Sequence, residues 1–329
     1  MRSVFNEGRP SKSSSRSTQK PFSFSVFFRG AEFLTVSVPS PDTRPGTHQG
    51  PGFLLACGRG IAPGAATGVG YAGVVAPVAF SAPRGFYDAP FSVDLVTATS
   101  DARITFTTDG SAPTSGSTTF SDSIPIATSA VLRAAAFKND YLPSKVETHT
   151  YLFLNQVLAQ PAEIPGYPNN TYSVGGYEES TAVHDYEMDP FIVNDPVYGP
   201  LMVNAMRAVP TVSIAVDPGE IFGVTGFYDG EDIIKRASVE VIYPDNPATS
   251  HQADTGIESH SHNRLKRSLR LNFKTEYGAD WFDTDLFQRS PLNGNSATDR
   301  VKRIILRAGN NRSWHPRTHR LSSKKECNR

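Results

Sequence analysis

The sequence predicts a mainly β protein with some α-helix, in which an immunoglobulin-like β-sandwich is followed by an α+β domain. Three observations support this fold class. Gly and Pro are frequent, at 26 and 25 of 329 residues, which is typical of a turn-rich chain. Short stretches within 79–154 alternate apolar and polar residues without a helical period. Strand and helix signals then mix over 185–315.

The first 78 residues give the weakest signals. Residues 1–60 show no sustained period of 2 or 3.6, so we leave them unassigned and expect a disordered or misread stretch. Residues 61–78 are interpreted as a linker. Within 21–38, Arg29 and Glu32 interrupt the apolar run well before the ~20 residues that a membrane span needs. We therefore expect no membrane span, and no secretory signal is visible at the start of this chain.

Residues 79–154 are interpreted as the sandwich. Phe91, Val93 and Leu95 fall on alternate positions, as expected for short strands. Asp109-Gly110 is a hairpin signal because Gly tolerates a positive φ. Further strands are expected near 104–107, 131–136 and 146–153, which together predict an immunoglobulin-like arrangement.

The second half alternates helix and strand signals. Residues 155–184 are interpreted as a linker that begins with a short helix. Asn194 or Asp195 can cap a helix that has Pro196 in its first turn and runs to about Ala208. Strands are expected at 211–216 and 238–243, with a turn or short helix at 217–223.

Bulk charge and cysteine content exclude several classes. Lys and Arg number 32, and so do Asp and Glu, so we expect no nucleic-acid partner. Residues 316–329 form a basic tail, which is typical of a solvated segment. Cys57 and Cys327 fit no zinc spacing and predict no structural disulfide.

The sandwich region resembles a known module. The resemblance is carried by Phe80 to Tyr87, by Thr107-Thr108-Asp109-Gly110-Ser111-Ala112-Pro113-Thr114 and by Leu132 to Phe137. These blocks resemble the chitobiase/β-hexosaminidase C-terminal-type module, also called fibronectin-III-associated. This resemblance implies an immunoglobulin-like fold for 79–154.

A second resemblance covers 185–315. Its blocks are Met188-Asp189-Pro190, Asn194-Asp195-Pro196, Pro210-Thr211-Val212-Ser213, Ala237-Ser238-Val239-Glu240-Val241, Lys266-Arg267-Ser268-Leu269-Arg270-Leu271 and Leu306-Arg307-Ala308-Gly309-Asn310. They resemble the N-terminal part of a CotH-type (spore coat protein H) kinase, and so imply an incomplete α+β kinase-like domain. The family implies ATP with Mg or Mn, a protein substrate, and an extracellular or cell-surface location in bacteria.

Lys266, Arg267 and Arg270 are the candidate cofactor-binding residues, because a kinase needs cations beside the nucleotide phosphates. An ordinary half-exposed strand gives the same pattern. Glu258 stands where the family has a cation, which is adverse to phosphate binding. The family's catalytic and metal-binding acids are expected beyond Asn310, so we assign no catalytic or metal residue and expect this chain to transfer no phosphate.

Three weaker alternatives remain open. His251, His260 and His262, or Asp283 with Asp285, have spacings that could bind a metal. A carbohydrate- or surface-binding adhesion protein would use exposed aromatic residues of the sandwich, with a polysaccharide as partner. Its candidate residues are Phe86, Tyr87 and Tyr141. The sandwich could also be a rigid spacer, which is the default for a small module of this kind.

Overall fold

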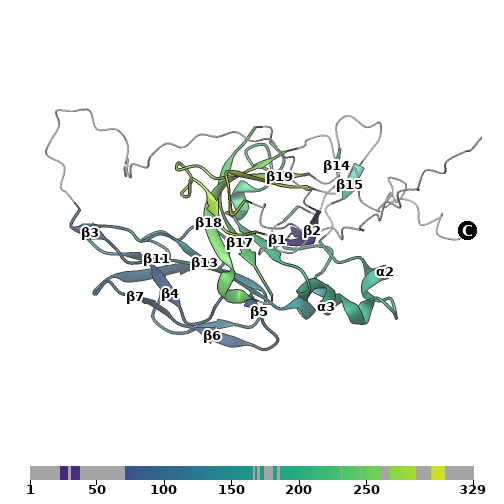
Figure 1. The fold of residues 1–329 in the computed structure, drawn as a ribbon, viewed down its shortest axis with the longest axis horizontal. Helices are drawn as coiled ribbons and strands as arrows, with labels where there is room; N and C mark the ends of the chain where they lie inside the picture. Colours follow the sequence, from purple (N-terminus) through teal and green to yellow (C-terminus); the bar gives the residue numbers. More distant parts are fainter. Residues whose placement is uncertain are drawn as a thin grey trace, which may run out of the picture.

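The computed structural model describes 23–28, 31–37, 71–165, 167–168, 171–173, 181–183, 186–230, 232–244, 246–260, 267–286 and 298–307. These residues are mainly β-strand with few helices (Figure 1). The strands form two layered parts, a sandwich made by 73–152 and a larger sheet made mainly by 211–306.

The sandwich contains one five-stranded sheet and three strand pairs. The five-stranded sheet has the order β5-β13-β11-β8-β9, where β5 is Gly85–Phe86, β13 Glu147–Leu152, β11 Ala130–Phe137, β8 Arg103–Thr107 and β9 Thr118–Thr119. The pairs are β4 (Val78–Phe80) with β7 (Leu95–Thr97), β6 (Phe91–Val93) with β10 (Ile124–Ile126), and β3 (Gly73–Val74) with β12 (Tyr141–Leu142).

The core of the sandwich confirms the expected alternation. Val93, Leu95, Leu132 and Tyr151 are buried in one cluster between the layers. The strand pair β3 and β12 shows that 71–78, the described part of the expected linker 61–78, joins the sandwich. Gly73–Val74 pairs with Tyr141–Leu142. Val75 and Val78 are buried in the sandwich core, which holds this segment against the sandwich.

The second sheet has seven strands in the order β2-β1-β16-β17-β18-β19-β22. Their bounds are β2 Ala31–Ser37, β1 Ser23–Phe28, β16 Thr211–Ala215, β17 Lys235–Ile242, β18 His251–Ser259, β19 Leu269–Asn272 and β22 Arg303–Leu306. β1 pairs with β16 in parallel, whereas the other neighbours are antiparallel. The interpretation of 1–60 missed β1 and β2, although Ser23-Phe24-Ser25-Val26 alternates polar and apolar residues as a strand does.

Short helices and strand pairs complete the second part. They are α1 Leu154–Leu158, α2 Pro190–Val193, η1 Gly199–Leu201, α3 Met202–Arg207, η2 Pro218–Glu220, η3 Pro247–Thr249, β14 Thr171–Ser173 with β15 Thr181–Val183, and β20 Phe282–Asp283 with β21 Arg300–Val301. Among the helices of the described residues, none has the length and apolar character needed to cross a bilayer.

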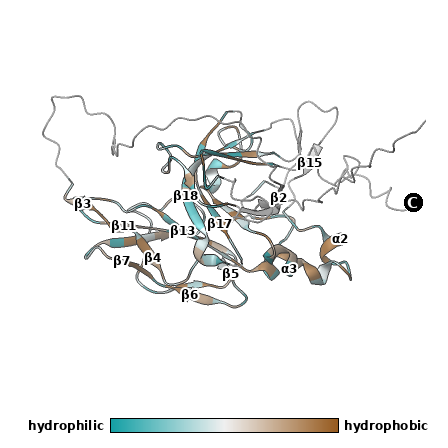
Figure 2. Ribbon diagram, viewed as in Figure 1, coloured by the Kyte–Doolittle hydropathy of each residue, from teal (hydrophilic) through white to brown (hydrophobic). Residues whose placement is uncertain are grey.

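The prediction of one helix from about 195 to 208 is wrong. The chain forms α2, then a turn, and only then η1 and α3. Asp195 does cap, since its Oδ1 accepts the backbone N–H groups of Val197 and Tyr198 at 2.8 Å each, but it caps a turn. Pro200 follows too soon for a regular helix, because it has no N–H to donate. The α2 segment is mostly hydrophobic, whereas α3 mixes apolar residues with Asn204 and Arg207 (Figure 2).

The two parts meet along β13 and β17, which lie side by side in Figure 1. One face of β17 packs into the core of its own sheet through Val239 and Val241. Ile242 on the other face joins a second cluster with Leu152 of β13 in the sandwich and Val157 of α1. β17 is therefore buried on both faces, and the sandwich covers one side of the second sheet.

Candidate functional site

Arg270, the basic residue of β19, is paired with an acidic residue of β18. Arg270 faces Glu258 across the antiparallel register, with its Nη1 3.0 Å from Glu258 Oε1. Nδ2 of Asn272 donates to the same oxygen at 2.7 Å, and Nη2 of Arg270 contacts Nδ1 of His260. Glu258, which the sequence predicted to lie beside the nucleotide phosphates, thus pairs with Arg270, the cation that was expected to bind those phosphates.

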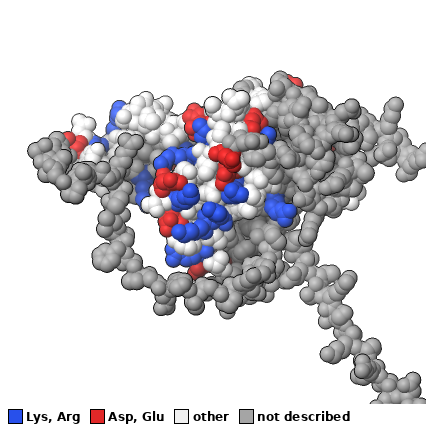
Figure 3. All heavy atoms as spheres, turned by 90° about the horizontal axis from the view of Figure 1, so that it is seen from above, with Lys and Arg blue, Asp and Glu red and all other residues white. Residues whose placement is uncertain are grey.

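Of the other two candidate cations, the structure describes Arg267. Arg267 Nη1 donates to the carbonyl oxygen of Asp229 at 3.3 Å, and its guanidinium lies 5.6 Å from the ring centre of Tyr228. Lys266 lies outside the described residues. On the face shown in Figure 3, positive and negative side chains are interspersed, so that face presents no single-sign surface for a polyanion.

The two described histidine candidates are not brought together. His251 begins β18 and His260 follows its last residue, so the length of the strand separates them, and His262 lies outside the described residues. The His251 ring packs edge-on against Phe282, and burial lowers its pKa. Within the described ranges, which include Asp283 and Asp285, no three His, Cys, Asp or Glu side chains lie together so that they could hold a metal ion.

The three aromatic candidates for polysaccharide binding are packed into the protein. Tyr87 stacks on Phe91 with ring centres 4.1 Å apart, and its hydroxyl donates to the Pro83 carbonyl at 2.6 Å. Phe86 packs against the cluster that joins the two parts, and Tyr141 packs against the sandwich core. All three side chains are half-buried, so each ring is only partly open to solvent, and polysaccharide binding by these residues stays a prediction.

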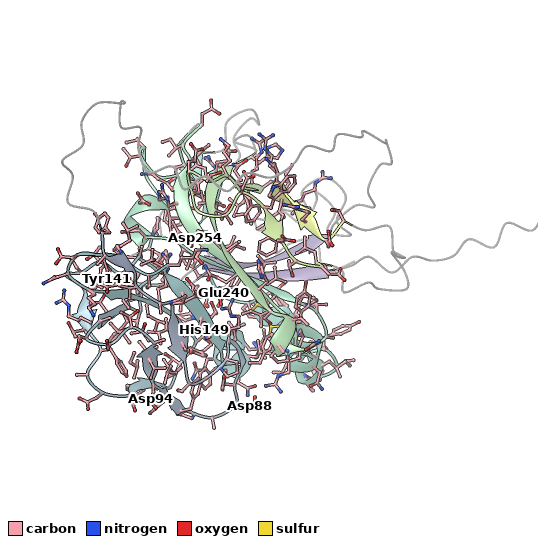
Figure 4. The ribbon with its side chains drawn as sticks, turned by 60° about the vertical axis from the view of Figure 1, so that its left-hand side comes forward. Asp88, Asp94, Tyr141, His149, Glu240 and Asp254 are labelled. Carbon is pink, nitrogen blue, oxygen red and sulfur yellow. The ribbon has the colours of Figure 1, made fainter. Side chains whose placement is uncertain are left out.

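The junction between the two parts contains a buried charge. Glu240 on β17 is 1% exposed, and one carboxylate oxygen lies 3.4 Å from Arg84 Nε of the sandwich. The backbone N–H of Thr150 donates to the same carboxylate at 3.3 Å, and the Thr150 hydroxyl bonds to it as well. Figure 4 shows Glu240 between His149 of the sandwich and Asp254 of the sheet. A buried carboxylate is stable only when it is paired and hydrogen-bonded in this way.

A second contact brings the sandwich hairpin against β16. Arg133 is 5% exposed, and its Nη1 donates to the Gly110 carbonyl at 2.9 Å. Gly110 has φ +97°, and a Cβ at this position would lie 2.7 Å from the Val216 carbonyl oxygen. The Asp109-Gly110 turn predicted from the sequence therefore serves two needs, a positive φ and a close backbone approach.

Burial dominates the electrostatics of this junction. It raises the pKa of Glu240, although the Arg84 charge and the Thr150 hydrogen bonds oppose that rise. It lowers the pKa of His149 to about 3, while the Nδ1–H donates to the Ala82 carbonyl at 3.1 Å. Burial also raises the pKa of Asp254. Since the Glu240 carboxylate is shielded from solvent, it can cross-link the two parts but cannot reach a substrate.

Sequence reasoning missed Arg84 and Glu240 as paired residues. A usable signal lay in β17, where Ile242 shares a face with Glu240 and is apolar. An apolar residue on the face opposite Val239 and Val241 indicates that both faces are covered. A charged residue in such a strand then requires a partner from another element.

The fold and the junction define a class of chain: a small β-sandwich module fixed to a second, larger sheet. Residues 82–148 match the family model of the chitobiase/beta-hexosaminidase C-terminal domain, so this segment is such a domain. The match lies within the sandwich from before β5 into β13 and includes the Asp109-Gly110 turn. Comparison of the chain with curated proteins and with solved structures gave no match.

Proposed function

We propose that this chain is a rigid structural unit of a modular extracytoplasmic protein and does not itself transfer phosphate. Its chitobiase-type module holds a second domain that resembles the nucleotide-side part of a CotH-type kinase. The observation that carries this proposal is the buried Arg84–Glu240–Thr150 junction. A module that served as a freely moving spacer would be expected to share a small, solvated surface with its neighbour.

The junction supports rigidity in two ways. Its apolar part buries Leu152, Val157 and Ile242 in one cluster, which stabilises contact between the parts. Its polar part is directional, because Glu240 is satisfied only when Arg84 and Thr150 stand at their present positions. An ion pair of Arg207 on α3 with Asp88 of the sandwich adds a third contact near the surface.

Arg267 and Arg270, the two candidate cations that the structure describes, do not fit ATP with Mg or Mn. Phosphate binding requires cations with free donors aimed at the ligand. Arg270 is paired with Glu258, and a triphosphate beside that pair would face the carboxylate as well. Arg267 lies against Tyr228 and the Asp229 carbonyl. We derive no phosphoryl-transfer step for this chain.

The test is incubation of the full chain with labelled ATP, Mg²⁺ or Mn²⁺, and a Ser-rich acceptor peptide. We expect no label above background in the acceptor or in the chain itself. Transfer above background that is lost in Arg270→Met would overturn the proposal, because it would show Arg270 acting on a nucleotide. A Lys302→Met variant is the matched control, since Lys302 pairs with Asp280 on the exposed surface.

A further inference from the structure

A groove opens where the end of the sandwich meets the second part. Its volume is about 450 Å³, within the range of pockets that hold small ligands. The sandwich contributes Asp109, Thr128 and Ser129 to its wall, and α1 with the chain after it contributes Gln156 and Gln160. The described residues assigned from the sequence to phosphate, metal or polysaccharide binding lie outside its lining.

The lining of the groove is more apolar than polar and almost uncharged. Asp109 is the one charged side chain among the described residues that line the groove, which contain no Lys or Arg. Two amides and two hydroxyl groups supply donors and acceptors, while Tyr167 and Pro218 supply apolar surface. A phosphorylated or carboxylated ligand would find no cation here. A neutral polyhydroxylated ligand can match both kinds of surface, because sugars combine hydroxyl groups with apolar C–H faces.

The polar side chains are held in place before any ligand enters. Gln156 Nε2 donates to the Ala127 carbonyl at 3.0 Å, and its Oε1 accepts the Ser129 N–H at 3.1 Å. Gln160 Nε2 donates to the Tyr186 carbonyl. An amide N–H₂ has two donors and its oxygen two lone pairs, so each amide retains hydrogen-bonding capacity.

The aromatic wall is fixed as well. The Tyr167 ring meets Tyr186 and Phe222 edge to face, with ring centres 6.0 and 6.1 Å apart. Walls that are ordered in advance lose little conformational entropy when a ligand binds. Rigidity of this kind is an advantage for flexible, weakly binding ligands such as oligosaccharides.

We propose that this groove binds a short neutral oligosaccharide, with the amides of Gln156 and Gln160 bonding to its hydroxyl groups and Tyr167 covering a C–H face. The site belongs to the junction, since the sandwich and the second part both line it. The proposal goes beyond the structural role above, and it would make the joined unit a carbohydrate-binding one.

The experiment is calorimetric titration of the full chain with chitotetraose, cellotetraose and xylotetraose. We expect at least one of them to bind, with a dissociation constant of roughly 0.1–1 mM. Thr128→Arg places a long side chain at the exposed rim of the groove and should weaken that binding about tenfold or more. Thr118→Arg changes an exposed threonine on β9, outside the groove, and should leave binding unchanged.

Two results would overturn the assignment. One is no heat of binding for any of the three sugars at concentrations of about 5 mM. The other is equal binding by wild type and Thr128→Arg, provided that both melt at the same temperature. If a proline-rich decapeptide binds in a Thr128-sensitive manner while the sugars do not, the groove is a peptide site and the saccharide proposal fails.

Discussion

Arg84 of the sandwich and Glu240 of β17 form an ion pair across the junction, with 3.4 Å between Arg84 Nε and Glu240 Oε1. Glu240 is 1% exposed and the Arg84 side chain 12% exposed, so both charges are largely removed from water. Each charge is tolerated because the other is present.

Removing one member of this pair should destabilise the protein strongly. Arg84→Met leaves the Glu240 carboxylate buried without its cation, and we expect the free energy of unfolding to fall by about 3 kcal/mol. Glu240→Leu should lower the free energy of unfolding by a comparable amount, because it leaves the largely buried Arg84 guanidinium without its carboxylate. The double variant should lose clearly less than the sum, and chemical denaturation of the four proteins measures the difference. Additive losses would show that the two residues are not coupled.

Gly110 should be intolerant of a side chain. Gly110→Ala adds a methyl group 2.7 Å from the Val216 carbonyl oxygen at φ +97°, and we expect a loss of roughly 2 kcal/mol in thermal or chemical unfolding. Gly116→Ala is the matched control in the same region, because its Cβ would meet only Thr114 Oγ1 at 3.7 Å. Equal effects of the two changes would argue against close contact between the hairpin and β16.

His149 should make the protein sensitive to acid. Its folded-state pKa of about 3 lies below the ordinary value of 6.5, so between these values the unfolded chain binds a proton that the folded chain does not. Stability contributed by neutral His149 is therefore present above pH 6.5 and is lost as the pH falls towards 3.

The matched variant is His149→Phe, which can keep the stacking on Phe80. Denaturation of both proteins between pH 7 and 4 should show wild type losing more stability than the variant as the pH falls. The buried acids Glu147, Glu240 and Asp254 are common to both proteins, so their opposing contributions cancel in the comparison. Parallel pH profiles would contradict a depressed pKa for His149.

The Glu258 carboxylate should contribute to stability through two partners. Arg270→Met removes a charged hydrogen bond across β18 and β19, and we expect a loss of about 1.5 kcal/mol in chemical denaturation. Lys302→Met removes an exposed ion pair with Asp280 and should be nearly neutral. If Arg270→Met also left the free energy of unfolding unchanged, the pairing of Arg270 with Glu258 would be too weak to explain why Arg270 is unsuited to phosphate binding.

Local patterns predicted the strands of the sandwich but not what covers them. The alternation of Val93 and Leu95 and the Asp109-Gly110 turn follow from period and turn chemistry, which nearby residues determine. Arg133 is buried near Glu240 and Asp254 of the second sheet, and no local period reports such a contact. The predicted helix over 195–208 failed for a local reason, since capping by Asp195 and the position of Pro200 outweighed the helical signal.

The candidate site was harder to predict than the fold. Residue type correctly identified Arg270 as a strand cation, but its function depends on the partner opposite it. Glu258 precedes it by twelve positions, and only the β18–β19 register shows that the two residues face each other. Likewise, Arg84 and Glu240 are far apart in sequence, so their pairing follows from how the sandwich packs on the sheet.

The central claim is that the sandwich and the second sheet form one rigid unit. Differential scanning calorimetry of the full chain tests it most directly. The account predicts a single cooperative transition, with calorimetric and van't Hoff enthalpies that agree, because the buried junction couples unfolding of the two parts. Two separate transitions in the wild-type chain, unchanged in Arg84→Met, would contradict it.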